Sequence, residues 1–182
     1  MKKLIDLHIH TTYSDGVLTP KEVIDEALVN KVSTIAICDH DTIDAYTNEL
    51  FEYAKEKAIK LITGVEISTK TKKCGIHVLG YNFDLNNDEF RKKLYNLRNA
   101  RHIYLRNVAK KLEELGYKVA VDELDNIEAV TKAHIANDVI GKNKTENKFS
   151  AALPHGKAFL LHRTKLVLHR PALDGRHPIV FH

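Results

Sequence analysis

The stretch DLHIHTTYSDG, residues 6–16, places two histidines and two aspartates around a short apolar pattern. Side chains of a β-strand alternate between its two faces, so Leu7 and Ile9 share one face and His8 and His10 share the other. Imidazoles gathered on one face cost free energy unless they find partners. The stretch therefore predicts a strand whose polar face belongs to a site.

Strand and helix patterns alternate after this stretch. Helices are predicted at residues 19–31 and 45–58, and strands at residues 34–42, 60–69 and 74–83. In the first helix Thr19 is placed as N-cap, Pro20 at the first helical position and Glu22 in the first turn. Strands that alternate with helices predict an α/β fold with a largely parallel sheet, open or closed into a barrel.

The pattern becomes helical at residue 88. Apolar residues recur at helical spacings between Phe90 and Leu115, and Gly116 follows where a helix C-terminus favours glycine. Two shorter helices, VDELDNI and TKAHIANDVIG, are predicted next. We therefore predict the N-terminal part of a β/α barrel at residues 1–87, a helical insertion or cap at 88–141, and an atypical tail at 142–182 in which neither periodicity persists.

Composition narrows the class of protein. The chain has 182 residues, is 43% hydrophobic and carries a net charge of +4. All of this excess charge lies in residues 150–182, so the folded part is neutral and a nucleic-acid-binding module is disfavoured. The two cysteines, Cys38 and Cys74, form neither a metal pair nor a disulfide framework and are predicted to be buried strand residues. No membrane segment is visible, which favours a cytoplasmic protein.

Titratable residues collect where the predicted strands end. They are His8, His10 and Asp15 after the first strand, Asp39, His40 and Asp41 after the second, and Glu66 near the end of the third, while His77 lies within the fourth. Ligand sites of parallel sheets form at the carboxyl ends of the strands. Imidazole and carboxylate without thiolate favour a hydrolytic zinc, manganese or iron centre over a structural zinc site.

Single residues of this set have simpler interpretations. A lone His77 is more often a hydrogen-bonded core histidine, and a lone Glu66 is more often a solvated charge. His102 is predicted to be a surface histidine, and His134 is equally consistent with a helix surface and with a site. The coincidence of these clusters at successive strand ends favours the metal centre.

The motifs DLHIHTTYSDG, ICDHDT, GVEIS and IHVLGY, in this order and spacing, resemble the first motifs of the PHP (polymerase and histidinol phosphatase) domain, in its stand-alone phosphoesterase branch. The resemblance covers residues 3 to about 141. It implies a distorted seven-stranded (β/α)7 TIM-like barrel with a helical insertion and two or three divalent metal ions, Mn, Zn or Fe.

The resemblance also implies roles for individual residues. His8, His10 and Glu66 would hold one metal ion, Asp15 and His40 would contribute to a second, and Glu66 with His77 would bridge towards a third. Asp15 or His40 would protonate the leaving alcohol, and Asp6 would orient a ligand histidine. The residues implied near the substrate phosphate are Arg98, Arg101, Lys132 and His134. Lys132 stands where the family usually has arginine, which weakens bidentate phosphate binding.

The chain departs from the family in its last part. The Ala-His-Pro and terminal Asp-x-His motifs that complete the family's metal ligation do not occur with the right spacing, so His169, Asp174 and His177 are not assigned to those roles. The barrel is therefore expected to be incomplete, and residues 142–182 are interpreted as a disordered, truncated or out-of-frame tail.

The expected function is hydrolysis of a phosphomonoester by a metal-activated water. The substrate implied by the resemblance is a nucleoside 3',5'-bisphosphate or the 5' end of a short oligonucleotide. Two alternatives stay open, a histidinol-phosphate phosphatase and an inactive metal-binding remnant. We expect a small phosphorylated substrate as partner, no stable nucleic-acid complex and no membrane association, and the sequence leaves the oligomeric state open.

Overall fold

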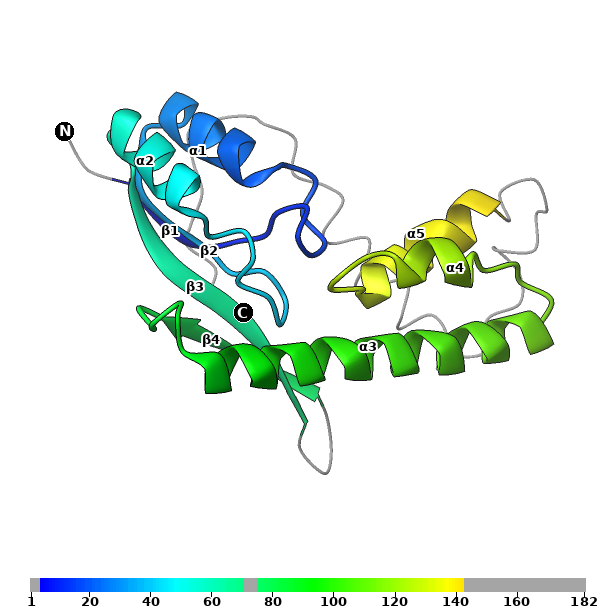
Figure 1. The fold of residues 1–182 in the computed structure, drawn as a ribbon. Coiled ribbons are helices and arrows are strands. Elements are labelled where there is room, and N and C mark those ends of the chain that lie inside the picture. The colour runs from blue at the N-terminus through cyan, green and yellow to red at the C-terminus, as the bar shows by residue number, and fades with distance from the viewer. Residues whose placement is uncertain (1–3, 71–74, 143–182) are drawn as a thin grey trace.

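The computed structural model describes residues 4–70 and 75–142 (Figure 1). Its elements in chain order are β1 (Leu4–Ile9), α1 (Pro20–Val29), β2 (Val32–Ile37), α2 (Asn48–Glu56), β3 (Lys60–Lys70), β4 (Gly75–Tyr81), α3 (Asp88–Glu114), α4 (Val121–Asp125) and α5 (Lys132–Lys142). Cys74 and residues 143–182 of the predicted tail lie outside the described residues. None of the described helices is long and apolar enough to cross a membrane.

The four strands form one strongly curved sheet in the order β1-β2-β3-β4 (Figure 1). The pairs β1–β2 and β2–β3 are parallel, as the alternation of strands and helices predicts. The pair β3–β4 is antiparallel, because the connection between these strands is too short for the crossover that a parallel pair needs. The result is a mixed α/β fold with a curled half-barrel sheet, and closure into a seven-stranded barrel stays a prediction.

The antiparallel pair changes the place of Glu66 in the sheet. The parallel pairing of β2 with β3 ends at Ile37 and Thr63, but β3 continues to Lys70 because β4 pairs with its second half. Glu66, predicted near the end of its strand, therefore lies inside β3 opposite Leu79. A residue inside a strand is held by hydrogen bonds on both sides of it, so its position is fixed more firmly than that of a loop residue.

The first helix begins as its sequence predicts. The Thr19 side chain accepts a hydrogen bond from the backbone N–H of Glu22, and the Glu22 carboxylate accepts one from the backbone N–H of Thr19 at 2.8 Å. This reciprocal pair is a capping box, and Pro20 follows the cap without losing a hydrogen bond. The helix thus starts immediately after the loop that carries Asp15.

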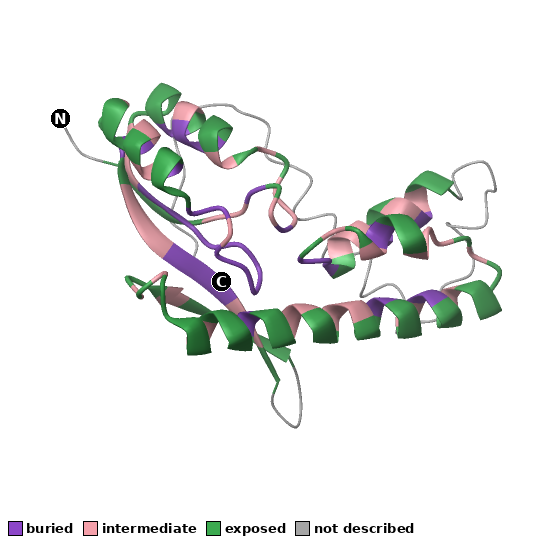
Figure 2. Ribbon diagram, viewed as in Figure 1, coloured by how far each residue is buried: buried purple, intermediate pink, exposed green. Residues whose placement is uncertain are grey.

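One hydrophobic core joins the sheet to α1 and α2. These two helices lie together over one face of the sheet, and their buried residues Ile24 and Leu50 pack with Ile35 and Ile37 of β2 (Figure 1). Buried residues run along the second half of β2 and the middle of β3 (Figure 2). Cys38, predicted to be a buried strand residue, is buried but lies just beyond the end of β2.

A second hydrophobic core lies in the helical region. Its buried residues are Leu105 of α3, Leu124 of α4, Val130, and Ile135 and Val139 of α5. The predicted long helix is the 27-residue α3, which contacts the first core through Leu94 and the second through Leu105. It ends at a Schellman motif, in which Gly116 donates to the Glu113 carbonyl at 2.8 Å and Tyr117 donates to that of Leu112 at 3.0 Å. One helix therefore connects both cores.

Candidate metal centre

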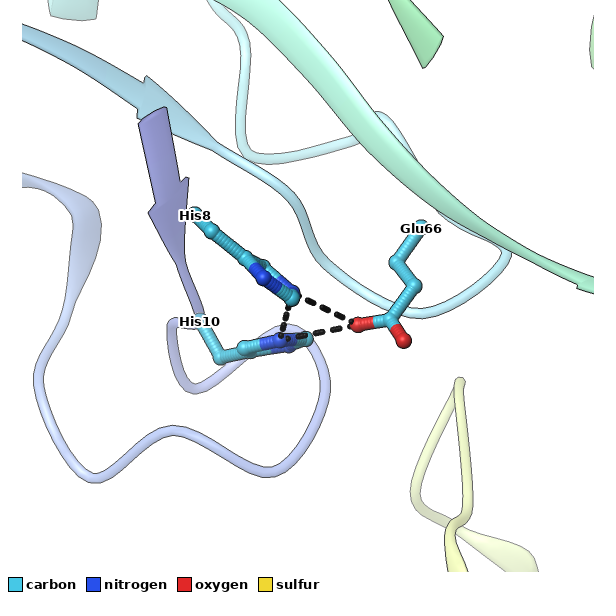
Figure 3. Close-up of side chains that lie close together, drawn as sticks. All are labelled: His8, His10 and Glu66. Carbon is cyan, nitrogen blue, oxygen red and sulfur yellow. Dashed lines mark hydrogen bonds and ion pairs between the residues drawn. The ribbon is translucent and has the colours of Figure 1, made fainter. Parts of the chain in front are cut away.

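His8, His10 and Glu66 point toward one another from β1, the residues just after it, and β3 (Figure 3). Nε2 of His8 and Nε2 of His10 lie 2.9 and 3.0 Å from the same oxygen, Oε2 of Glu66, and 3.1 Å from each other. The two histidines share a face of the chain around β1, as the alternation at residues 6–16 predicts. Three potential ligand atoms thus converge on one point from strands that are two apart in the sheet.

Two further groups overlap the first. His40 Nε2 lies 3.5 Å from Oδ2 of Asp15, and Nδ1 of His10 lies 3.3 Å from Oδ1 of Asp15. On the other side, Nδ1 of His77 lies 2.6 Å from Oε1 of Glu66. The candidate ligands form three groups, and within each group the ligand atoms lie within 4.8 Å of one another. The first group is His8, His10 and Glu66, the second is His10, Asp15 and His40, and the third is His40, Glu66 and His77. The structure therefore brings together all six residues predicted to hold metal ions.

The Tyr46 hydroxyl separates β2 from β3 just before the centre. It accepts hydrogen bonds from the backbone N–H groups of Ile37 at 3.1 Å and Gly64 at 2.7 Å, and it donates to the Ile37 carbonyl at 2.6 Å. We call this inserted hydroxyl the Tyr46 wedge. Beyond it, β2 and β3 approach again at an isolated parallel bridge between His40 and Glu66. The resumed pairing sets His40 beside Glu66.

Gly16 lets the loop after β1 fold back tightly. A Cβ atom at Gly16 would lie 2.2 Å from the carbonyl oxygen of His10, closer than real Cβ contacts come. The Gly16 N–H donates to the Thr11 carbonyl at 3.0 Å, which closes the loop. This close return brings Asp15 next to His10, so glycine in the sequence SDG has a steric reason.

The charges of the centre stabilise one another. Burial opposes ionisation of Glu66, but hydrogen bonds from His10, His77 and His8 outweigh it and hold the pKa of Glu66 well below its usual range. Burial likewise opposes ionisation of Asp15, and the hydrogen bond and charge of His40 still hold its pKa far below the ordinary value. Burial lowers the pKa of His10, yet the hydrogen bond to Glu66 and the charge of Asp15 raise it overall.

The donor set fits divalent metal ions. Nδ1 of His40 is buried and has no hydrogen-bond partner among the described residues, and such an atom costs free energy unless a ligand completes it. The converging atoms are imidazole nitrogens and carboxylate oxygens, which zinc, manganese and iron accept. The nearby Cys38 thiol is unsuited as a ligand, because burial raises its pKa to about 12 and its Sγ donates to the Leu7 carbonyl at 3.2 Å.

The arginines predicted to bind phosphate are held by acidic side chains of the half-barrel. Nε of Arg101 lies 2.6 Å from Oδ2 of the buried Asp41. Arg98 donates to the Asp41 carbonyl at 3.2 Å and lies 3.4 Å from Oδ2 of Asp44 and 3.1 Å from Oε1 of Glu128. Both arginines therefore join α3 to the loop that carries His40.

The other two predicted phosphate residues lie in α5. His134 is close enough to the centre for the charges of Asp15 and His40 to act on its pKa, which burial lowers. Its Nδ1 accepts a hydrogen bond from the backbone N–H of Thr131 at 3.0 Å. Lys132 instead places Nζ 5.7 Å over the ring of Tyr104. The charges of Asp15 and His40 thus reach His134, whereas the Lys132 ammonium lies against Tyr104 of α3.

His102 and Asp6 have defined partners in the structure. The side chain of His102 is 18% exposed, and its Nδ1 lies 2.9 Å from Oδ1 of Asp125 while its Nε2 lies 3.3 Å from the Glu128 carbonyl oxygen. It joins α3 to α4. The Asp6 carboxylate, predicted to orient a ligand histidine, accepts a hydrogen bond from the backbone N–H of His8 at 3.2 Å and so contacts the main chain.

Sequence reasoning counted Asp39 among the titratable residues at the strand ends but gave no individual role to Asp39, Thr11 or Ser14, although all three are buried. Thr11 and Ser14 donate hydrogen bonds to the Asp39 carboxylate across the boundary between β1 and β2. The sequence pattern that could have indicated this contact is an acidic residue at the end of one apolar strand, together with hydroxyl residues in the loop after the previous strand.

Comparisons with known proteins agree with this geometry. The model of the PHP domain family matches residues 6–153. A 5'-3' exoribonuclease of Haemophilus influenzae is 39% identical over 163 residues, which cover 87% of this chain and 59% of that protein. A 3',5'-nucleoside bisphosphate phosphatase of Chromobacterium violaceum is 31% identical over 140 residues, which cover 75% of this chain and 49% of that protein.

One solved structure also resembles this chain. It is described as an amidohydrolase from Chromobacterium violaceum with bound sulfate and no metal, and it matches with a TM-score of 0.70 at 29% identity over 84% of this chain and 56% of that chain. The chain thus spans about half the length of these proteins. Because the family model covers most of the sequence, the chain belongs to the PHP domain family.

Proposed function

We propose that this chain is a metal-dependent phosphoesterase that removes a phosphate from a small nucleotide. The observation that carries the proposal is the overlap of three histidine and carboxylate groups that share His10, His40 and Glu66. Overlapping groups suit two or more ions held close together, which is the arrangement used for phosphoester hydrolysis. Relatives named as a nucleoside bisphosphate phosphatase and an exoribonuclease support a nucleotide substrate.

The six converging residues would hold the metal ions. His8, His10 and Glu66 would bind one ion, Asp15 and His40 would bind a second, and Glu66 with His77 would complete a third. When bound, divalent ions lower the pKa of a coordinated water and neutralise the phosphoryl oxygens. Mn, Zn and Fe all fit the nitrogen and oxygen donors, and none of the described donors selects among them.

The remaining residues of the centre would bind and orient the substrate. Cationic groups that face the transferred phosphate stabilise the charge that develops on it. Arg101 uses three of its nitrogens for Asp41, Ser68 and the Val130 carbonyl, which leaves further N–H groups for a phosphate. Arg98, Lys132 and His134 would complete the phosphate contact. Asp15 or His40 would donate the proton to the leaving alcohol.

The substrate class follows from the relatives. We propose a nucleoside 3',5'-bisphosphate or the 5'-phosphorylated end of a short oligonucleotide, in line with the two named activities. Histidinol phosphate and an inactive, metal-binding role are the competing assignments. A substrate without a base would make fewer contacts with the cap and would be bound less tightly.

The test combines metal content with phosphate release. The purified chain is loaded with Mn²⁺, its metal content is measured by mass spectrometry, and phosphate release is compared for adenosine 3',5'-bisphosphate, a 5'-phosphorylated trinucleotide and histidinol phosphate. We expect bound metal and turnover of a nucleotide substrate, and in His8→Ala the loss of turnover and of the ion held by His8, His10 and Glu66.

His102→Ala is the matched control, because His102 is also paired with a carboxylate but lies outside the centre. It should keep its metal and its activity. Preference for histidinol phosphate would replace the proposed substrate class. Metal binding without turnover of any of the three compounds would favour the inactive role.

A further inference from the structure

Ser68 lies in β3 where the candidate metal centre meets the helical region. Side chains two positions apart in a strand share a face, so Ser68 is on the same face of β3 as Glu66. In the antiparallel pair of β3 with β4, Ser68 lies opposite His77, whose Nδ1 is 2.6 Å from Oε1 of Glu66. Residues opposite each other in such a pair point to the same face. Ser68 therefore shares its face of the sheet with two of the six candidate ligands.

The Ser68 hydroxyl contacts α3 through Arg101. Nη2 of Arg101 lies 2.6 Å from Oγ of Ser68. A guanidinium carries only donors, so Oγ is the acceptor and the hydroxyl keeps its own proton for another partner. The buried Asp41 carboxylate holds the two residues side by side, because Oδ1 accepts from the Ser68 backbone N–H at 2.7 Å and Oδ2 accepts from Nε of Arg101 at 2.6 Å.

Donors without an acceptor gather at this contact. In the part of the chain that the structure describes, the Ser68 hydroxyl donates no hydrogen bond, and the residue is only half-buried, so a ligand can reach it. Three of the five Arg101 N–H groups are used for Asp41, Ser68 and the Val130 carbonyl. One N–H therefore remains on each terminal nitrogen of Arg101, next to the proton of the hydroxyl.

We propose that Ser68 is a substrate contact, whose hydroxyl donates a hydrogen bond to an oxygen of the phosphate that Arg101 binds. A phosphate monoester offers several oxygens that accept hydrogen bonds from charged and neutral donors. Ser68 would reach it from β3 and Arg101 from α3, so the phosphate would lie between the half-barrel and the helical region. The proposal rests on the proposed function, because that function supplies the phosphate.

The next residue of β3 offers a matched control. The Thr69 side chain points to the opposite face of the strand, and its hydroxyl donates to the Ile76 carbonyl at 2.7 Å. Thr69→Val and Ser68→Ala therefore each remove one hydroxyl from β3. Only Ser68→Ala removes a hydroxyl that lies beside Arg101.

The first measurement is the dissociation constant of inorganic phosphate by titration calorimetry at pH about 8, where phosphate is a dianion. It is made on the chain stripped with a chelator and on the chain loaded with Mn²⁺. We expect Ser68→Ala to bind phosphate about 10-fold more weakly than the wild type, and Thr69→Val to stay within about twofold. Unchanged binding in Ser68→Ala, an equal loss in Thr69→Val, or no binding by the wild type in either state would overturn the proposal.

The second measurement separates a direct contact from an effect through Arg101. In Ser68→Ala the planar guanidinium keeps Asp41 at Nε and Val130 at Nη1, so it should stay in place. In the stripped, ¹⁵N-arginine-labelled chain, the Nε–H resonance of Arg101, identified by its absence in Arg101→Met, reports on the bond to Asp41. We expect this resonance to keep its position in Ser68→Ala. A shift to the position of an arginine in solvent would mean that Ser68 only places Arg101, and would overturn the direct contact.

Neither measurement depends on turnover. A wild type that binds phosphate through Ser68 but hydrolyses none of the three test compounds would confirm the contact and remove the proposed function. A wild type that hydrolyses a nucleotide while Ser68→Ala binds phosphate unchanged would do the reverse.

Discussion

Replacing Arg101 with methionine would test how firmly α3 is attached to the half-barrel. Arg101 donates to Oδ2 of Asp41 and to the Ser68 hydroxyl, both at 2.6 Å, and to the Val130 carbonyl at 3.3 Å. Asp41 is fully buried, whereas the Arg101 side chain is 16% exposed. After the substitution Asp41 keeps the Ser68 backbone N–H at Oδ1 but loses the Arg101 donor at Oδ2.

The expected cost follows from the burial of the pair. Removing one partner of a buried ion pair costs about 3–5 kcal/mol, because the other charge is left uncompensated. The partial exposure of Arg101 places the expected loss in the free energy of unfolding near the lower end, about 3 kcal/mol. For a domain of this size, that loss lowers the melting temperature by roughly 6–12 °C.

Arg106→Met is the matched control. Arg106 lies on the same helix and also pairs with an aspartate, Asp125, at 2.6 Å, but its side chain is 58% exposed. Arginine and methionine have similar helix propensities, so neither substitution changes α3 itself. An exposed pair of this kind contributes about 0–1 kcal/mol.

Urea denaturation followed by the helical circular dichroism signal gives both free energies. Equal losses for Arg101→Met and Arg106→Met would show that burial of Asp41 does not control the strength of the attachment. A loss below about 1 kcal/mol for Arg101→Met would refute the assignment of a buried, uncompensated charge.

Three further predictions concern single features of the structure. Tyr46→Phe leaves the buried N–H groups of Ile37 and Gly64 without their acceptor, so chemical denaturation should show a loss of about 2–4 kcal/mol, and a loss under 1 kcal/mol would contradict the wedge. Gly116→Ala should lower the free energy of unfolding by only about 1 kcal/mol in the same assay, because alanine is disfavoured at a φ of +84° but its Cβ would meet no atom within 4 Å. A much larger loss would show that the added Cβ clashes with a neighbouring atom. Mn²⁺ should raise the melting temperature of the wild type but not of Glu66→Gln, since Glu66 shares two of the three ligand groups, and an equal rise in both proteins would remove Glu66 from the ligand set.

Much of the local structure could be predicted from sequence. The Thr19 capping box and the glycine after α3 are confirmed, because caps depend on a few neighbouring residues. The shared face of His8 and His10 is confirmed for the same reason, since strand alternation is a local property. The roles of the metal and phosphate residues stay predictions, although the structure brings the metal residues together.

Other features could not be predicted because they depend on contacts between distant segments. The short connection between the predicted strands at 60–69 and 74–83 favours antiparallel pairing, but nothing in the residues around Glu66 indicates that the parallel pairing of β2 with β3 ends at Thr63, three residues before it. The pairing of His102 with Asp125 could not be predicted because Asp125 belongs to another helix. Likewise, an arginine in a charged helix gave no sign that its partner would be the buried Asp41.

The sequence by itself determined which residue types supply the chemistry and which strand faces they occupy, because periodicity and capping act over a few residues. Only the tertiary structure decided that His8 and Glu66, 58 positions apart, approach to 2.9 Å, and that Asp39 contacts Ser14 in the loop after β1. Those contacts arise from the curvature of the sheet and from the Tyr46 wedge between β2 and β3, which depend on packing between elements.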